Sequence, residues 1–150
     1  MRAESIRFVD TWFEEVWRKG SAEAIDAMVA DDAVMHGLGE ADAVVRGGGG
    51  FKPFVERMRG AFPDVDIRPV LTIEEDDLIA TRWVATMTHQ GDQLGVPATG
   101  RRVTVTGMTI VRLRDGKIVE AWNNYDQLSL MQQIGALQSA VALVADVVRP

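Results

Sequence analysis

Asp126 is the residue of this 150-residue chain whose type and position best suit it to do chemistry. It ends the segment Lys117–Asp126, which the pattern predicts to be a strand running into a helix. Regular alternation places Asp126 on the face that carries Ile118, Trp122 and Asn124. A carboxylate beside apolar and aromatic groups is desolvated, which disfavours its charged form and suits it to general acid/base catalysis. Asp126 could equally cap the following helix, and the sequence leaves both roles open.

Arg82 is the second charged residue in an unusual setting. It lies within an apolar stretch, residues 78–85, that predicts a buried strand, and alternation places Val84 on its face. A buried guanidinium needs a carboxylate or a ligand oxygen as its partner. Arg82 is therefore predicted either to form a structural ion pair or to belong to a site. If it faces Asp126, the two form a charged pair in an apolar cup.

The two histidines, His36 and His89, lie on different predicted elements. From the residues alone, His36 is interpreted as a partly buried structural histidine and His89 as the anchor of a loop. No H-E-x-x-H, C-x-x-C or dense carboxylate cluster predicts a metal site, and no G-x-S-x-G predicts a serine nucleophile.

Composition limits the classes of partner. A net charge of −6 argues against nucleic acid and anionic membranes, since both select basic surfaces. With no cysteine, neither disulfides nor thiol chemistry is expected. The first residues lack the apolar core of a signal peptide, and the apolar run 140–145 is too short to span a membrane, so we expect a cytoplasmic protein.

The order of patterns predicts a single α+β domain over residues 1–150. Helical spacing predicts three helices before residue 63, with Asp31 and Asp32 ending the second and a flexible loop at Gly47–Gly50 leading into the third. From Val65 the period changes to two, which predicts an antiparallel meander, and a last helix follows Asp126. The chain ends in an apolar tail, residues 139–150. Its stretch from Ala140 to Val148 is too apolar to be left in water, so a homodimer is predicted.

A series of short motifs occurs in a recognisable order. They are Phe62–Asp64, Thr88–Gly91, Leu94–Arg101, Asp115–Glu120, Trp122–Asp126 and Gln133–Gly135. Together, over roughly residues 5–137, they resemble the SnoaL-like polyketide cyclase family of the nuclear transport factor two-like superfamily. The resemblance implies a cone-shaped, cystatin-like α+β barrel, in which helices close the concave face of a curved, mainly antiparallel sheet around a pocket.

The resemblance also implies a function. Cyclases of that family use an aspartate at the end of the last strand as acid/base for an intramolecular aldol ring closure, without a metal or organic cofactor, and Asp126 matches that position. Polar pocket residues are implied at His36 and at Asn124, where some relatives carry histidine. We therefore predict a cofactor-independent cyclase or isomerase acting on a hydrophobic, carbonyl-activated small molecule. Its catalytic residues are Asp126 and Arg82, and its substrate-binding residues are His36, Asn124, Trp122, Met35, Leu38 and Val84.

Two alternatives remain open. Limonene epoxide hydrolase-like enzymes of the same superfamily use an Asp–Arg–Asp set, of which Arg82 and Asp126 match two members, while Val84 stands where the other aspartate is expected. The second alternative is a non-catalytic dimer that binds a small molecule, because the fold does not determine the function.

Overall fold

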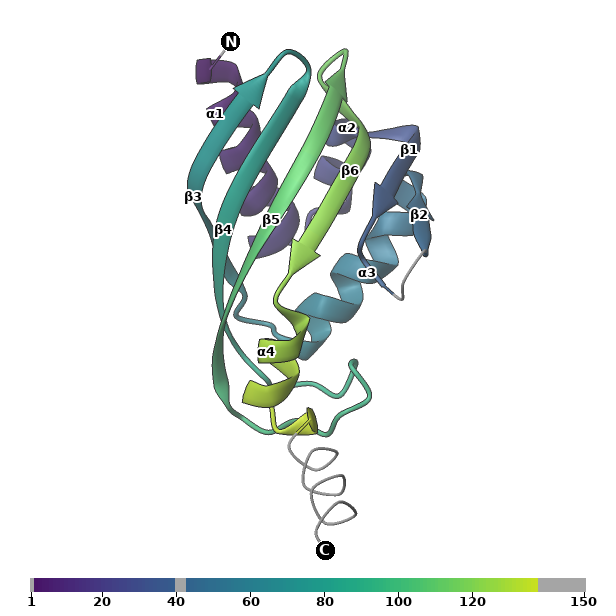
Figure 1. Ribbon diagram of the computed structural model, residues 1–150. Coiled ribbons are helices and arrows are strands. Elements are labelled where there is room, and N and C mark those ends of the chain that lie inside the picture. The colour runs from purple at the N-terminus through teal and green to yellow at the C-terminus, as the bar shows by residue number, and fades with distance from the viewer. Residues whose placement is uncertain (1, 40–42, 138–150) are drawn as a thin grey trace, which may run out of the picture.

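The computed structural model describes residues 2–39 and 43–137, and Figure 1 shows the arrangement of their elements. The predicted apolar tail, residues 139–150, lies outside the described residues. The elements follow the order α1 (Arg2–Thr11), η1 (Trp12–Arg18), α2 (Ala22–Met28), β1 (Val29–His36), β2 (Val44–Arg46), α3 (Gly47–Ala61), β3 (Asp66–Glu75), β4 (Leu78–Thr88), β5 (Arg102–Arg114), β6 (Lys117–Tyr125) and α4 (Gln127–Gln133).

The sheet is curved and mainly antiparallel, as predicted. Its strand order is β2-β1-β6-β5-β4-β3, and only the β1–β6 pairing is parallel. Helices α1, α2 and α3 gather on one side of it, and α4 continues from the end of β6 (Figure 1). Apolar residues from both layers form the core between them. This α+β architecture agrees with the predicted fold class.

The helices follow from local signals, with two corrections. The Ser21 hydroxyl accepts a hydrogen bond from the Ala24 N–H at 3.1 Å and so caps α2. Asp31 and Asp32, predicted to end that helix, are instead part of β1. The first predicted helix divides into α1 and the π-helical η1, because its carbonyl-to-amide bonding lengthens from Trp12 onward.

Gly47–Gly50 forms the first turn of α3 rather than a flexible loop. Gly47 has a φ of 65°, and a Cβ there would come within 2.4 Å of the Asp31 carbonyl oxygen. Its neighbour Gly48 is buried, and a Cβ on it would come within 3.2 Å of Ile25. Tertiary packing of α3 against β1 and α2 therefore outweighs the poor helix propensity of glycine.

Two β-bulges determine which side chains face inward. In β3, Pro69 pairs with Trp83 and Leu71 with Arg82, so Val70 is an extra residue. Proline within a sheet is found at edge strands and bulges, which fits Pro69 here. In β6, Ile118 pairs with Leu113 and Glu120 with Arg112, which leaves Val119 as an extra residue. An extra residue reverses the alternation for the rest of its strand.

Candidate functional site

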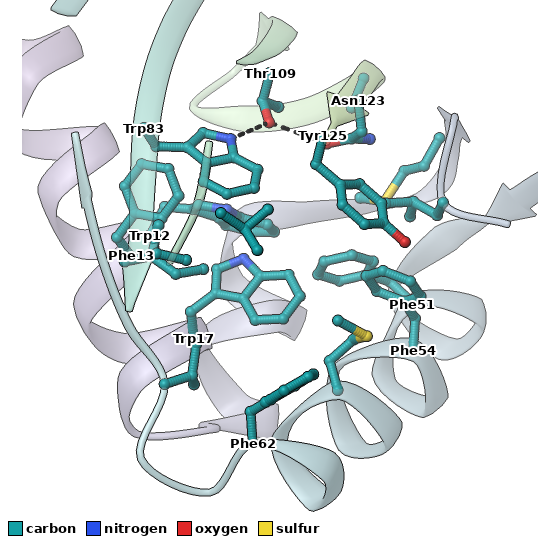
Figure 2. Close-up of a pocket in the computed structure, with 18 of the residues that line it drawn as sticks. Trp12, Phe13, Trp17, Phe51, Phe54, Phe62, Trp83, Thr109, Asn123 and Tyr125 are labelled. Atoms are coloured by element: carbon teal, nitrogen blue, oxygen red, sulfur yellow. Dashed lines mark hydrogen bonds between the residues drawn. The ribbon is translucent and has the colours of Figure 1, made fainter. Parts of the chain in front are cut away.

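A cavity with about 840 Å³ of empty space, its open mouth included, lies between the helices and the sheet (Figure 2). Eight aromatic residues line it: Trp12, Phe13, Trp17, Phe51, Phe54, Phe62, Trp83 and Tyr125. Trp12 stacks on Phe51 with ring centroids 5.4 Å apart, and Trp17 meets Phe54 edge-on at 5.9 Å. Such walls favour a flat, apolar ligand.

A chain of hydrogen bonds crosses the sheet side of the cavity. The Trp83 indole N–H donates to Thr109 Oγ1 at 3.1 Å, and the Thr109 hydroxyl donates to Asn123 Oδ1 at 3.2 Å (Figure 2). Asn123 Nδ2 in turn donates to the main-chain carbonyl of His36 at 3.0 Å. Four strands are joined in this way, and the orientation of the Asn123 amide is fixed by partners on both of its ends.

Tyr125 is the titratable group of the cavity. Its side chain extends from β6 into the cavity, with the hydroxyl pointing away from the sheet (Figure 2). Burial raises the pKa of the Tyr125 phenol above its ordinary value, an effect that the positive charge of Arg57 opposes. Among the described residues, no Asp, Glu, His, Lys or Arg lines this cavity. An ionic ligand would therefore enter it without a counter-charge, so the cavity suits an uncharged one.

Two of the predicted substrate-binding residues do line the cavity. Met35 is buried on β1, and Leu38 is buried shortly after that strand. Both side chains contribute to the cavity wall, and their role in binding a substrate stays a prediction.

Asp126 lies outside the cavity lining, with an exposed side chain. It is the N-cap residue of α4, where its Oδ1 accepts a hydrogen bond from the Ser129 N–H at 3.0 Å. The capping role left open by the sequence is thus observed, whereas the expected apolar surroundings of the carboxylate are not.

Trp122 and Asn124 were predicted to face the pocket and instead lie on the outer face of the sheet. The bulge at Val119 explains the error, because it reverses the alternation counted from Ile118. Asn123 and Tyr125 line the cavity in their place. Nothing in the local sequence marks Val119 as an extra residue, so alternation did not predict Asn123 and Tyr125 as cavity residues. Thr109 on β5 was not predicted either.

Arg82 and Val84 also lie on the outer face, where Arg82 is exposed. Their neighbours Trp83 and Ala85 line the cavity instead. The apolar residues around Arg82 do not mark a strand that is buried on both sides. On the outer face of β4 they are only half-buried. The prediction that Arg82 and Asp126 line one pocket is therefore wrong.

The histidines occupy different environments. His36 lies on the outer face, where its ring stacks on Trp122 with centroids 5.7 Å apart and its Nε2 lies 3.1 Å from Glu120 Oε2. It does not line the cavity. His89 is fully buried, and its Nδ1 lies 3.0 Å from Thr99 Oγ1 and accepts from the Thr99 N–H at 3.3 Å. That contact holds the loop after β4, as predicted for His89.

The outer face carries two rows of paired residues from neighbouring strands. One row runs Ile73–Ala80–Ile110–Trp122–His36, and the other runs Leu71–Arg82–Met108–Asn124. Leu71, Ile73 and Met108 each keep more than half of their surface exposed. This sheet face therefore presents a sizeable apolar patch.

Within residues 2–39 and 43–137, no three His, Cys, Asp or Glu side chains come together as metal ligands would. Nor does any helix in the described part of the chain have the length and hydropathy required to cross a membrane.

Comparisons with known proteins agree with the observed fold. The model of the SnoaL-like polyketide cyclase family matches residues 7–134. Wild-type IdmH from Streptomyces antibioticus, a proposed polyketide cyclase, is 30% identical with a TM-score of 0.76, covering 87% of this chain and 98% of its own. TsrD from Streptomyces laurentii is 25% identical with a TM-score of 0.80, covering 91% and 98%.

AclR from Streptomyces galilaeus, a proposed hydroxylase, is 28% identical with a TM-score of 0.78, covering 90% of this chain and 87% of its own. A search of curated proteins found no match. The family match covers most of the chain and agrees with the observed sheet, helices and enclosed cavity. The chain therefore belongs to the SnoaL-like polyketide cyclase family.

Proposed function

We propose that this protein is a cofactor-independent cyclase or isomerase that holds an uncharged, flat carbonyl compound in the aromatic cavity and promotes intramolecular carbon–carbon bond formation. The observation that carries the proposal is the cavity itself. Its aromatic walls bury the apolar body of a ligand, and the strip formed by Thr109 and Asn123 supplies fixed polar groups on one side. Holding a flexible chain so that two of its carbons meet removes much of the entropic barrier to ring closure.

An aldol-type closure begins with removal of a proton from carbon next to a carbonyl group. Because the described lining of the cavity contains no carboxylate or imidazole, we propose Asp126 as the base. It follows the cavity-lining Tyr125 directly, at the junction of β6 and α4. To reach a ligand, the Asp126 carboxylate would have to give up the hydrogen bond that it accepts from the Ser129 N–H. We therefore propose that the entry of the ligand is coupled to the loss of this helix cap.

The same lining favours a second candidate, a binding protein that performs no chemistry. A cavity walled by aromatic and aliphatic groups, with no charged group among the described lining residues, is sufficient for binding alone. Epoxide hydrolysis has less support, because Arg82 and Val84 lie on the outer face and no Asp–Arg–Asp set is assembled in the cavity.

Deuterium exchange separates a catalyst from a binder without knowledge of the natural substrate. In D₂O, a base removes a C1 proton of 2-tetralone to give the enolate, which then takes a deuteron from solvent. We expect the wild-type protein to accelerate this exchange above the buffer rate, as followed by NMR. If 2-tetralone binds but exchanges at the buffer rate, the protein is a binder for this class of ketone and the catalytic proposal fails.

We further propose a homodimer, formed through the outer sheet face rather than the tail. The exposed apolar residues Leu71, Ile73 and Met108 support this choice, because they lie on one face of the sheet, in the two rows that also contain Ala80 and Arg82. A second copy of the chain offers the same face and can cover them by two-fold symmetry.

A further inference from the structure

The Tyr125 hydroxyl is a polar group of the cavity that has no hydrogen-bond partner among the described residues, as are the indole N–H groups of Trp12 and Trp17. Thr109 and Asn123 satisfy one another and their neighbours, from the Trp83 indole to the His36 carbonyl. No hydrogen bond within residues 2–39 and 43–137 involves the Tyr125 hydroxyl, although it points into the cavity among aromatic rings (Figure 2). The hydroxyl is therefore positioned to bond to whatever occupies the cavity.

The chemistry of the phenol determines which group a ligand must offer to it. A phenol has one O–H donor and a pair of acceptor sites. Because burial raises the pKa of Tyr125, the phenol stays protonated at neutral pH and remains a donor. A partly buried donor without an acceptor is unfavourable, and a ligand oxygen would recover that loss.

We propose that Tyr125 is the ligand-orienting donor of this cavity, and that its O–H bonds to the carbonyl oxygen of an uncharged, flat and mostly apolar compound. This inference rests on the proposed function, since it assigns a role within the same cavity. The carbonyl oxygen of the ligand would lie at the Tyr125 hydroxyl and its hydrocarbon body against Trp17, Phe51 and Phe54, which lie around the Tyr125 side chain in Figure 2.

The same bond serves the proposed reaction. When a neighbouring carbon loses its proton, negative charge develops on the carbonyl oxygen. A hydrogen bond to an ionised oxygen is about twice as strong as one to a neutral oxygen, so the phenol stabilises the enolate more than the ketone. With no cation among the described lining residues, neutral donors are what the cavity offers to that charge, and the phenol is one of them beside the indole N–H groups of Trp12 and Trp17.

The test compares 2-tetralone with tetralin, a matched pair that differs only in the carbonyl group. Affinities are measured by quenching of tryptophan fluorescence, because Trp12, Trp17 and Trp83 line the cavity. Tyr125→Phe keeps the ring and removes the hydroxyl. We expect it to weaken 2-tetralone binding by about two- to thirteenfold, the range that corresponds to one net hydrogen bond, while tetralin binding stays within about twofold.

Unchanged tetralin binding by Tyr125→Phe also shows that the variant is folded around an intact cavity. A second readout is the infrared stretch of the bound carbonyl, which should lie at lower wavenumber in the wild type than in the variant. If 2-tetralone binds both proteins equally and its stretch does not move, the role of Tyr125 is overturned while the proposed function stands. If neither probe binds the wild type, the proposed function fails first, and this inference fails with it.

Discussion

Thr109 and Asn123 face each other across β5 and β6, and the Thr109 hydroxyl donates to Asn123 Oδ1 at 3.2 Å inside the cavity. This pair connects Trp83 on one side to the His36 carbonyl on the other. The arrangement makes Asn123 an amide whose oxygen must accept and whose nitrogen must donate. Its replacement by a carboxylate is therefore a sensitive test of the site.

Asn123→Asp should destabilise the protein at neutral pH. One carboxylate oxygen can still accept from Thr109, but the other would face the His36 carbonyl oxygen that Nδ2 now donates to. We expect a loss of about 1–3 kcal/mol in the free energy of unfolding. The apolar cavity disfavours the charged form of the introduced group, so this loss should shrink as the pH falls toward about 4.

Denaturant titrations of the wild type and the variant across pH measure that difference. Thr109→Val provides the companion variant, because it leaves the Trp83 N–H and Asn123 Oδ1 without partners but introduces no charge. Its destabilisation should be independent of pH over the same range. A pH-independent deficit in Asn123→Asp would contradict the assignment of the bonds.

Asp126→Asn and Asp126→Ala separate capping from catalysis. Asparagine caps helices about as well as aspartate, so the first change should leave the melting temperature nearly unaltered. Alanine should cost about 1 kcal/mol by loss of the bond to the Ser129 N–H. If Asp126 is the base, Asp126→Asn should slow deuterium exchange into 2-tetralone by about 10²–10⁴-fold. Exchange at the wild-type rate would leave Asp126 as a cap only.

Tyr125 should titrate at unusually high pH. It is the single tyrosine of the sequence, so tyrosinate absorbance reports this residue alone. Burial raises its pKa above the ordinary value of 10.0. The folded state thus holds its proton more tightly than the unfolded chain, and this residue's contribution to stability is complete below about pH 10 and lost as the pH rises through the folded pKa.

Comparing wild type with Tyr125→Phe isolates that alkaline loss, since the variant has no phenol to ionise. The difference in unfolding free energy between the two proteins should change above about pH 10 and stay constant below it. A tyrosinate midpoint at or below 10 in the folded protein would show that the side chain is solvated and not held in the cavity.

Epoxide opening should be absent or very slow. With Arg82 exposed on the outer face and Asp126 at the cap of α4, the described residues place no carboxylate–arginine set around the cavity. Val84→Asp would add its carboxylate beside Arg82 on the outer face, so it should not create activity either. Conversion of limonene oxide or styrene oxide to the diol by the natural sequence, with label from H₂¹⁸O, would contradict this placement.

The outer sheet face should hold two copies together. Met108→Lys places a charge in the middle of the apolar patch, opposite Arg82 on β4, and should shift the molecule from dimer to monomer. Gln132→Lys on α4 is a matched control, because it adds the same charge at an exposed position away from that face. Light scattering near 16.5 kDa for the wild type at micromolar concentration would rule out the dimer.

The order and type of most elements follow from the sequence alone. Helical spacing before Pro63 and period-two spacing after Val65 separate α1–α3 from the meander β3–β6, because each period reflects one buried face. Asp126 was assigned as a possible cap for a local reason, since its side chain bonds within its own turn. Met35 and Leu38 were placed correctly because a short apolar piece has few ways to avoid the core.

Which residues face the cavity was decided only by the tertiary structure. The extra residue at Val119 appears in the pairing of β6 with β5, and no local signal in the sequence records it. Because of this extra residue, Asn123 and Tyr125 face the cavity, whereas plain alternation predicted Trp122 and Asn124. The prediction for Arg82 failed for another reason: the residues beside it on the outer face are apolar as well, so the sequence did not show which face is buried. Alternation reveals that a strand has two faces, but pairing and packing determine which one is inside.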